Sequence, residues 1–338
     1  MSAHIDCNKR SSPPDTPEIS VVIPAFNEAG NLESLYRALL PVLDAVTDHW
    51  ELVITDDGSR DDTWAQIKTL HTGDSRVRGV RLSRNFGHQY ALMAGLHHAR
   101  GRAVISMDAD MQHPPAVIPE LVAKWREGAR IVKTVRRDNT DLPAFKRLTS
   151  KWFYRLFSYL SGVELRPGMA DFRLLDHQVL QEILKFKEEG LFLRGIVQWV
   201  GFPSAEVEFD CGTRLSGESK YTLRRMLRFG WHGVSSFSIV PLRMGIGLGL
   251  ISSVIAFLAV IYAIVSKLGT GQTVPGWTST VAITSFLFGI LFIFLGILGE
   301  YIGRILLEVR DRPRFLVSET LGPPPAEPPT GTGDRNPF

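Results

Sequence analysis

Cysteine is nearly absent from this chain of 338 residues, which contains only Cys7 and Cys211. Two cysteines so far apart in the sequence fit neither a disulfide framework nor a zinc site with closely spaced ligands. Their scarcity suits a protein kept in a reducing compartment. The chain is long enough to form more than one domain and to bury a sizeable core.

Three further absences narrow the class of protein. The sequence contains no Gly-x-Gly-x-x-Gly motif after its first apolar run and no Walker lysine motif, which argues against a dinucleotide enzyme and a P-loop NTPase. The formal net charge of +3 is too small to indicate nucleic-acid binding, so we expect no nucleic-acid partner. Residues 1–17 lack the apolar core of a secretory signal and are expected to form a disordered leader. The proline-rich residues 321–338 are expected to form a disordered tail.

Short apolar runs alternate with amphipathic stretches along the first half of the chain. The expected strands are the runs Ile19–Pro24, Glu51–Ile54, Val77–Leu82, Ala103–Met107, Ile131–Val135 and Ala205–Phe209. Helical spacing of apolar residues predicts helices over Leu32–Leu43, Thr63–Leu70 and Val117–Trp125. This alternation predicts an α/β fold, with a mostly parallel sheet and helices on both of its faces.

Polar segments follow three of these runs directly. Pro24–Glu28, Asp56–Ser59 and Asp108–Gln112 each come where an expected strand ends. Because the carboxyl ends of parallel strands lie at one edge of the sheet, the three segments should converge on one crevice. The alternatives are local, since Asp57-Gly58-Ser59 could form an ordinary turn and Asn27 could cap a helix.

Asp108 and Asp110 are separated by one residue on backbone that has just left a strand. Two such carboxylates can point the same way and share a hard divalent cation, so the pair predicts a Mg²⁺ or Mn²⁺ site. An acidic turn ended by Pro114 and Pro115 is the alternative interpretation.

Four motifs together resemble one enzyme family. They are Val22-Ile23-Pro24-Ala25-Phe26-Asn27-Glu28, Asp56-Asp57-Gly58-Ser59, Arg84-Asn85-Phe86-Gly87-His88-Gln89 and Asp108-Ala109-Asp110-Met111-Gln112. Their order and spacing resemble the GT-A glycosyltransferases of family 2. The similarity is greatest to the polyprenyl-phosphate glycosyltransferases, such as dolichyl-phosphate mannose synthase and the bactoprenol glucosyltransferases. The resemblance covers Ile19 to Leu316 and implies the Rossmann-like GT-A fold.

The resemblance also implies roles for individual residues. The residues expected to bind the nucleotide are Pro24, Ala25, Asn27, Glu28 and Asp57. Asp108, Asp110 and Gln112 are expected to bind the metal that grips the diphosphate. His113 stands where this subgroup would as readily have aspartate, and it is not counted as a ligand.

Asp110 and Asp171 are the predicted catalytic residues. Asp171 lies in Gly168-Met169-Ala170-Asp171-Phe172-Arg173, which resembles the segment that closes the sugar pocket in the family. We expect Asp171 to face the anomeric centre or the acceptor, where it orients substrate rather than removing a proton. The alternative is an aspartate that caps a helix or pairs with Arg173.

Basic residues supply candidate contacts to phosphate. The set comprises Arg136, Arg137, Arg194, Arg214, Ser219 and Lys220. The arginine pair leaves a strand on the side of the carboxylates, and guanidinium groups bind phosphate in a bidentate manner. Arg194 could instead form a structural salt bridge. Arg214, Ser219 and Lys220 lie in a basic loop able to close over a diphosphate.

Two stretches without charge, residues 244–266 and 277–299, are each long enough to cross a bilayer as a helix. A buried helical hairpin is the alternative. The expected order is a catalytic domain over residues 18–221, an amphipathic juxtamembrane segment over 222–243, the two spans, and a cytoplasmic juxtamembrane segment over 300–320. The basic-aromatic stretch 145–157 is expected to lie at the membrane interface. Arginines flank both spans, so the positive-inside rule places the catalytic domain in the cytoplasm, on a bacterial inner membrane.

A nucleotide-sugar site beside a membrane suits a water-soluble donor and a lipid acceptor. The family resemblance implies transfer of a sugar from UDP-glucose, with GDP-mannose and other donors left open, to the phosphate of undecaprenyl or dolichyl phosphate. It is expected to depend on metal and to invert the anomer. Membrane lipids, a second copy of the chain, a downstream flippase and a lumenal or periplasmic glycosyltransferase are the expected partners.

Three alternatives remain at this stage. The chain could act on another lipid acceptor. It could be a processive polysaccharide synthase, although it lacks the Gln-x-x-Arg-Trp motif of such enzymes. It could also be a membrane-anchored scaffold that has kept the fold, against which the intact Asp108, Asp110 and Gln112 set argues.

Overall fold

The computed structural model describes residues 16–137, 169–186, 193–210, 276–310 and 312–323, together with some positions between 247 and 268. The centre of the described part is one eight-stranded sheet with the order β7-β5-β6-β4-β1-β2-β3-β8. Its strands are β1 (Ile19–Ala25), β2 (Trp50–Asp56), β3 (Val77–Leu82), β4 (Ala103–Ser106), β5 (Ile131–Arg136), β6 (Met169–Asp176), β7 (Ser204–Phe209) and β8 (Val317–Leu321).

The sheet is mostly parallel, as the sequence predicted. β1 pairs in parallel with β2 and β4, and β2 pairs in parallel with β3. β6 runs antiparallel to both β4 and β5, and β8 runs antiparallel to β3. Six of the eight described strands therefore point in one direction, and their carboxyl ends share one edge of the sheet.

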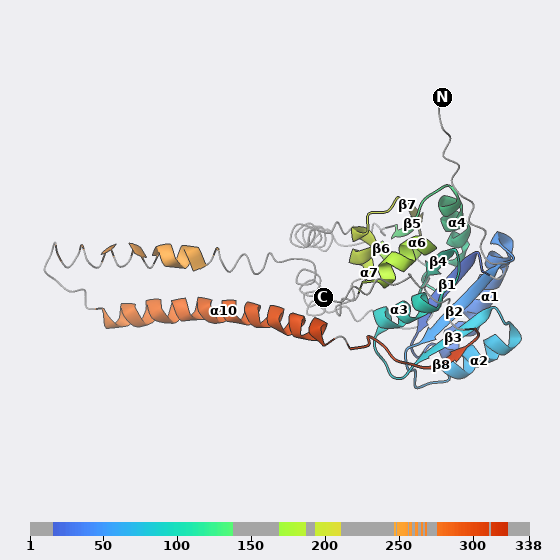
Figure 1. Cartoon of the computed structure of the whole chain (residues 1–338), viewed down its shortest axis with the longest axis horizontal. Coiled ribbons are helices and arrows are strands. Elements are labelled where there is room, and N and C mark those ends of the chain that lie inside the picture. The colour runs from blue at the N-terminus through green and yellow to red at the C-terminus, as the bar shows by residue number, and fades with distance from the viewer. Residues whose placement is uncertain are drawn as a thin grey trace, which may run out of the picture.

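Helices cover both faces of this sheet, which was also predicted (Figure 1). The helices that accompany the sheet are α1 (Ala29–Val46), α2 (Thr63–Gly73), α3 (His88–His98), α4 (Ile118–Arg126), α6 (His177–Leu184) and α7 (Leu193–Trp199). On one face, α1, α2 and α4 pack against alternate side chains of β1, including Ile19, Val21 and Ile23. On the other face, α3, α6 and α7 pack against Val22, Val53 and Val104.

Close packing of α3 depends on a glycine. A Cβ atom at Gly95 would lie 2.5 Å from Cγ1 of Val22 and 2.6 Å from Oγ1 of Thr55. The helix therefore sits directly on β1 and β2, and this contact positions the start of α3 beside the carboxyl edge of the sheet.

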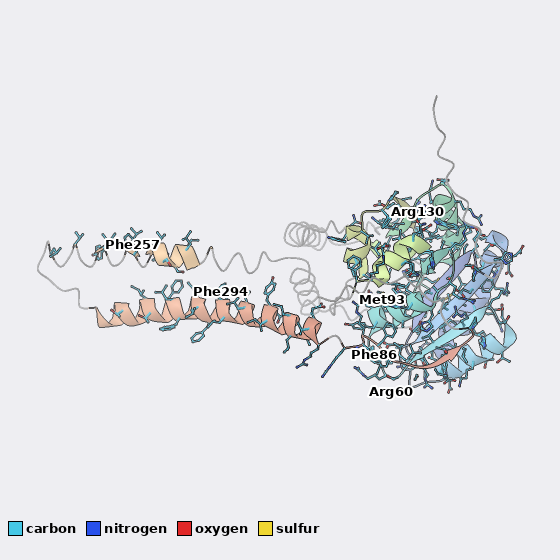
Figure 2. The ribbon with its side chains drawn as sticks, viewed as in Figure 1. Arg60, Phe86, Met93, Arg130, Phe257 and Phe294 are labelled. Carbon is cyan, nitrogen blue, oxygen red and sulfur yellow. The ribbon has the colours of Figure 1, made fainter. Side chains whose placement is uncertain are left out.

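The long helix α10 (Trp277–Val309) extends away from the sheet in Figure 1. Phe286–Val309 is long and apolar enough to cross a membrane, and it is the one such helix among the described residues. None of that segment is buried in the protein, and Phe294 lies on its surface in Figure 2. α10 covers the predicted span 277–299 and continues ten residues further. Many positions of the predicted span 244–266, and all of the segments 145–157 and 222–243, lie outside the described residues.

The structure bears on two sequence-based boundaries. Within the predicted juxtamembrane segment 300–320, the first part continues α10 and the last part enters β8. Leu321 is the final residue of β8, so the expected disordered tail cannot begin there. The sheet consequently contains a strand from well beyond the catalytic segment 18–221 that the sequence predicted.

Candidate active site

The three polar segments that follow β1, β2 and β4 meet at the carboxyl edge of the sheet. Ala25 is paired with Asp56, and the amide of Met107 donates to the carbonyl of Val22 at 3.1 Å. Asp108 therefore leaves β4 next to the end of β1. The predicted convergence of these segments is present.

Asn27 fixes the loop after β1 against the loop after β2. Its φ of 56° lies in the left-handed region, which asparagine tolerates better than most residues. Its amide donates to Oγ of Ser59 at 2.9 Å, and its Oδ1 accepts from the amide of Arg60 at 2.9 Å. Asn27, expected to contact nucleotide, thus already uses its side-chain oxygen to join the two loops. Glu28 extends this junction, since its amide donates to Oγ1 of Thr63 at 2.9 Å.

Asp57 organises the loop between β3 and α3. Its two carboxylate oxygens accept from the amides of Phe86 and Gly87, at 2.7 and 2.9 Å. Burial raises the pKa of Asp57, although these two amides oppose the shift. At Gly58, with φ 65°, a Cβ atom would lie 2.5 Å from the backbone carbon of Arg84. The Asp57–Gly58 turn and this loop therefore fit closely, and the carboxylate is held at the crevice by amides far away in the sequence.

The segment after β4 folds back on itself. Met111 has a φ of 62°, and the amide of Gln112 donates to Oδ1 of Asp110 at 3.1 Å. The amide of Asp108 donates to Nδ1 of His113 at 3.0 Å. This turn brings the predicted metal-binding residues Asp108, Asp110 and Gln112 into one short loop.

His113 holds this loop in place through its ring. It is buried, and its ring stacks on Phe172 with centroids 5.1 Å apart. Burial lowers the pKa of His113, and because Nδ1 accepts a hydrogen bond, the neutral ring carries its proton on Nε2. The structure therefore gives His113 a positioning role on the backbone of Asp108.

Negative charge accumulates in this crevice. The pKa of Glu28 is raised, first by burial and then by the charges of Asp110, Asp61 and Asp108, while a hydrogen bond from Asn31 opposes the shift. Nε2 of His88 lies 3.4 Å from Oδ1 of Asp108. Sequence reasoning assigned no role to His88; the available signal was its place in the motif that begins at Arg84.

The residues present fit a divalent cation. Asp108, Asp110 and Gln112 offer only oxygen atoms and amide groups, which suit a hard ion such as Mg²⁺ or Mn²⁺. Burial raises the pKa of Glu28 first and the charges of Asp110, Asp61 and Asp108 raise it further, so a cation beside these carboxylates would be stabilised. No group of three or more His, Cys, Asp or Glu side chains in the described ranges could hold a metal, and the predicted set includes a glutamine in place of a third carboxylate.

Asp171 lies in β6 and is almost fully buried, at 6 % exposure. It pairs with Arg173, and Arg194 donates to it through Nε at 3.0 Å and Nη2 at 2.8 Å. Gln89 donates to its Oδ2 at 3.3 Å. Burial opposes ionisation of Asp171, but the two arginines outweigh it and hold the pKa far below its usual range. Asp171 is therefore the buried partner of two arginines, and its pairing with Arg173 is part of the alternative interpretation of this residue.

The predicted phosphate-binding arginines have different surroundings. Arg136 is exposed at the carboxyl end of β5, on the same edge as Asp108. Arg137 pairs with Glu208 at 3.2 Å and with Asp210 at 3.3 Å, at the carboxyl end of the neighbouring strand β7. Arg194, on α7, forms the salt bridge with Asp171 while part of its side chain remains exposed. Arg214, Ser219 and Lys220 lie outside the described residues.

Comparison with known proteins agrees with this arrangement. The family model described as "Glycosyl transferase family 2" matches residues 20–184. The chain is 38% identical over 305 residues to the uncharacterized glycosyltransferase YkcC of Bacillus subtilis, covering 90% of this chain and 94% of that protein. It is 37% identical over 303 residues to the SfII prophage-derived bactoprenol glucosyl transferase of Shigella flexneri, covering 90% of this chain and 98% of that protein.

A solved structure also matches at low similarity. Glucosyl-3-phosphoglycerate synthase from Mycobacterium tuberculosis, in complex with Mn²⁺, UDP-glucose and phosphoglyceric acid, is 23% identical, with a TM-score of 0.42 over 63% of this chain and 76% of that one. That score is too low to support a conclusion about function. The two sequence relatives, each matched over nearly its whole length, show that this chain is a glycosyltransferase and belongs to family 2.

Proposed function

We propose that this glycosyltransferase moves one sugar, with glucose from UDP-glucose favoured, to the phosphate of a polyprenyl phosphate at a membrane surface. The proposal rests on two features that occur together in this chain. A crevice rich in carboxylates, which suits a metal-bound nucleotide diphosphate, is followed by an unburied apolar helix long enough to span a membrane.

The relatives support this choice of acceptor. The Shigella flexneri relative is named for glucosyl transfer to bactoprenol, a polyprenol, and the similarity includes the region of α10 because it extends over 90% of this chain. We therefore propose a membrane protein whose segments 244–266 and 277–299 both span the bilayer, with the catalytic domain on the cytoplasmic side. The arginines that flank these segments support that orientation.

Donor binding is assigned to the loops that follow β1 and β2. The loop from Pro24 to Glu28 and the carboxylate of Asp57 are proposed to contact the base and ribose. The hydrogen bonds that fix Asn27 and Asp57 form this surface before any ligand arrives, which reduces the ordering cost of binding. Asp108, Asp110 and Gln112 are proposed to hold the divalent cation, which when bound would neutralise charge on the departing diphosphate.

In the proposed reaction, an oxygen of the acceptor phosphate attacks the anomeric carbon of the sugar. The new bond between carbon and phosphate oxygen forms as the bond to the nucleoside diphosphate breaks, so one displacement inverts the anomer. The acceptor phosphate is already an anion and needs no strong base. Asp171 suits a reaction without a strong base, because its pKa is lowered and its carboxylate is paired with Arg173 and Arg194.

We assign Asp171 an orienting role. A carboxylate that accepts two hydrogen bonds from Arg194 fixes the plane of the guanidinium group, and the exposed part of that group can meet an anionic phosphate. Arg136, exposed at the same edge, is a second candidate for this contact. Arg137 is a weaker candidate because Glu208 and Asp210 already neutralise it.

The experiment that tests this function is a donor screen with the purified full chain in detergent. Undecaprenyl phosphate, Mg²⁺ or Mn²⁺, and a panel of UDP- and GDP-sugars are supplied, and products are identified by mass spectrometry. We expect one lipid product that carries a single sugar and is lost when a chelator is added. A polymer would favour a processive synthase. Release of free sugar alone would contradict the lipid acceptor.

A further inference from the structure

The chain that leaves the apolar helix returns to the catalytic sheet. Val309 ends α10, and eight residues later Val317 begins β8, at the edge of the sheet beside β3. Figure 1 shows α10 pointing away from the sheet and β8 beside β3 and α2. The register pairs Leu82 with Val317 and Gly79 with Leu321.

Side chains attach β8 to the catalytic part of the chain. Glu319 accepts from Nε1 of Trp64 at 2.9 Å and pairs with Nζ of Lys68 at 2.7 Å. Oγ of Ser318 donates to the carbonyl of Arg81 at 3.1 Å. Leu321 packs against the core on the α2 side. The strand is therefore docked by side chains from α2 as well as by the ladder.

The beginning of this strand also reaches the loop that carries the amides bound by Asp57. The amide of Ser83 donates to the carbonyl of Leu316 at 2.8 Å. Ser83 begins the loop that ends with Phe86 and Gly87, whose amides donate to Asp57. The loop is thus fixed at one end by the segment that follows the apolar helix and at the other end by a carboxylate of the candidate site.

Aromatic packing strengthens this connection. Phe315 lies against the ring of His97, with centroids 5.9 Å apart, and both Phe315 and Phe86 pack on the hydrophobic cluster around α3. In Figure 2, Phe86 lies on the side of the catalytic domain from which α10 extends, whereas Arg130 lies elsewhere on the domain. The loop therefore contacts the segment that follows α10 through Ser83 and the carboxylate of Asp57 through Phe86 and Gly87.

We propose that β8 is a positioning element for the donor site. Through β8, the apolar helix α10 keeps the Ser83–Gly87 loop, and with it Asp57, in its binding geometry. The inference rests on the proposed nucleotide-binding role of this crevice. Glu319 and Leu316 touch no substrate and act through the loop. If β8 is released, the loop gains conformational freedom, and that freedom has to be lost again when the donor binds.

Glu319→Lys in the full chain tests the proposal. It removes the acceptor of Trp64 and places a positive charge opposite Lys68. Thr320→Lys is the control, because it places a lysine at the adjacent, exposed position of the same strand. Glu319→Lys combined with Lys68→Glu restores the ion pair in reverse. Leu321→Asp is a second way to release the strand, through its packing against α2.

The first measurement is hydrogen exchange of peptides that cover residues 83–90 and 315–323, without ligand. We expect faster exchange of both in Glu319→Lys, near-parent exchange in Thr320→Lys, and recovery in the charge-swapped double variant. The second measurement is the Kd for UDP-glucose with Mn²⁺, which should rise about fivefold in Glu319→Lys and return to within about twofold in the double variant.

Two results would overturn the inference. One is release of residues 315–323, by Glu319→Lys or Leu321→Asp, without faster exchange in residues 83–90. The other is a freed loop with an unchanged donor Kd. If the parent chain binds no nucleotide-sugar, the proposed function fails separately, and the exchange data still decide whether β8 orders the loop.

Discussion

The two ends of the parallel strands both gather charged residues, but they balance the charge differently. At the amino ends, Glu51 lies between Arg78 and Arg100, at 2.8 and 3.1 Å, and also accepts from Oγ of Ser20. At the carboxyl ends, burial raises the pKa of Glu28 first, and the charges of Asp110, Asp61 and Asp108 raise it further. Among the described residues, arginines pair with the carboxylate at the amino ends, whereas carboxylates gather around Glu28 at the carboxyl ends.

The pKa directions of the two glutamates show what this difference means. Burial opposes ionisation of Glu51, but Arg78, Ser20 and Arg100 outweigh it and lower its pKa. Burial and neighbouring carboxylates together raise the pKa of Glu28. A charge cluster that the fold has neutralised serves stability, whereas a cluster of like charges in a crevice is a candidate site for a ligand of opposite charge.

Glu51→Gln should have the larger effect on stability. It leaves Arg78 buried without its charged partner, and loss of one member of a buried pair costs about 3 kcal/mol or more. Thermal unfolding of the full chain in detergent checks the loss. Transfer per folded molecule should stay within about twofold of the parent, because Glu51 is far from the carboxyl edge. A stable variant with impaired transfer would break the distinction between the two ends.

Glu28→Gln should change the stability less than Glu51→Gln does, and it should raise the stability. The folded-state pKa of Glu28 lies above the unfolded value of about 4.3. The ionised carboxylate therefore destabilises the fold, and stability falls as the pH rises through the window between the two pKa values. The substitution removes this penalty. We expect a gain below about 1 kcal/mol at pH 7, because the carboxylate is partly exposed and solvent screens it.

Adding a divalent cation to Glu28→Gln tests the difference between the two ends of the strands further. Thermal unfolding of Glu28→Gln and of the parent is followed with chelator and with Mn²⁺, at pH 5 and pH 8. The gain should be greatest at pH 8 with chelator and should shrink when the cation screens the cluster. A loss of stability under all four conditions would mean that Glu28 is a net stabilising group and that the crevice carries no excess charge.

Much of the fold was predictable from local patterns. Val77–Leu82 was predicted with the bounds of β3, and the apolar residues of α1 have helical spacing. The convergence of Pro24, Asp57 and Asp108 also followed from their positions after parallel strands. Each of these predictions depends on residues close together in the sequence or on a general rule of sheet topology.

β8 could not be predicted in the same way. Val-Ser-Glu-Thr-Leu is short and largely polar, and its pairing partner β3 lies more than two hundred residues earlier. α3 was not predicted as a helix, because Ala91–Leu96 are all buried and leave no amphipathic spacing to recognise. The state of Asp171 depended on Arg194, whose approach from α7 no spacing in the sequence shows.

The most direct test of the central claim, that the carboxyl edge is a cation-dependent donor site, is the rate of glycolipid formation by Asp108→Asn beside Glu51→Gln. Each rate is corrected for the folded fraction. We expect Asp108→Asn to lose at least about 100-fold in transfer while its melting temperature is unchanged or higher. Glu51→Gln should retain its rate per folded molecule. Full transfer by Asp108→Asn would contradict the assignment of the site.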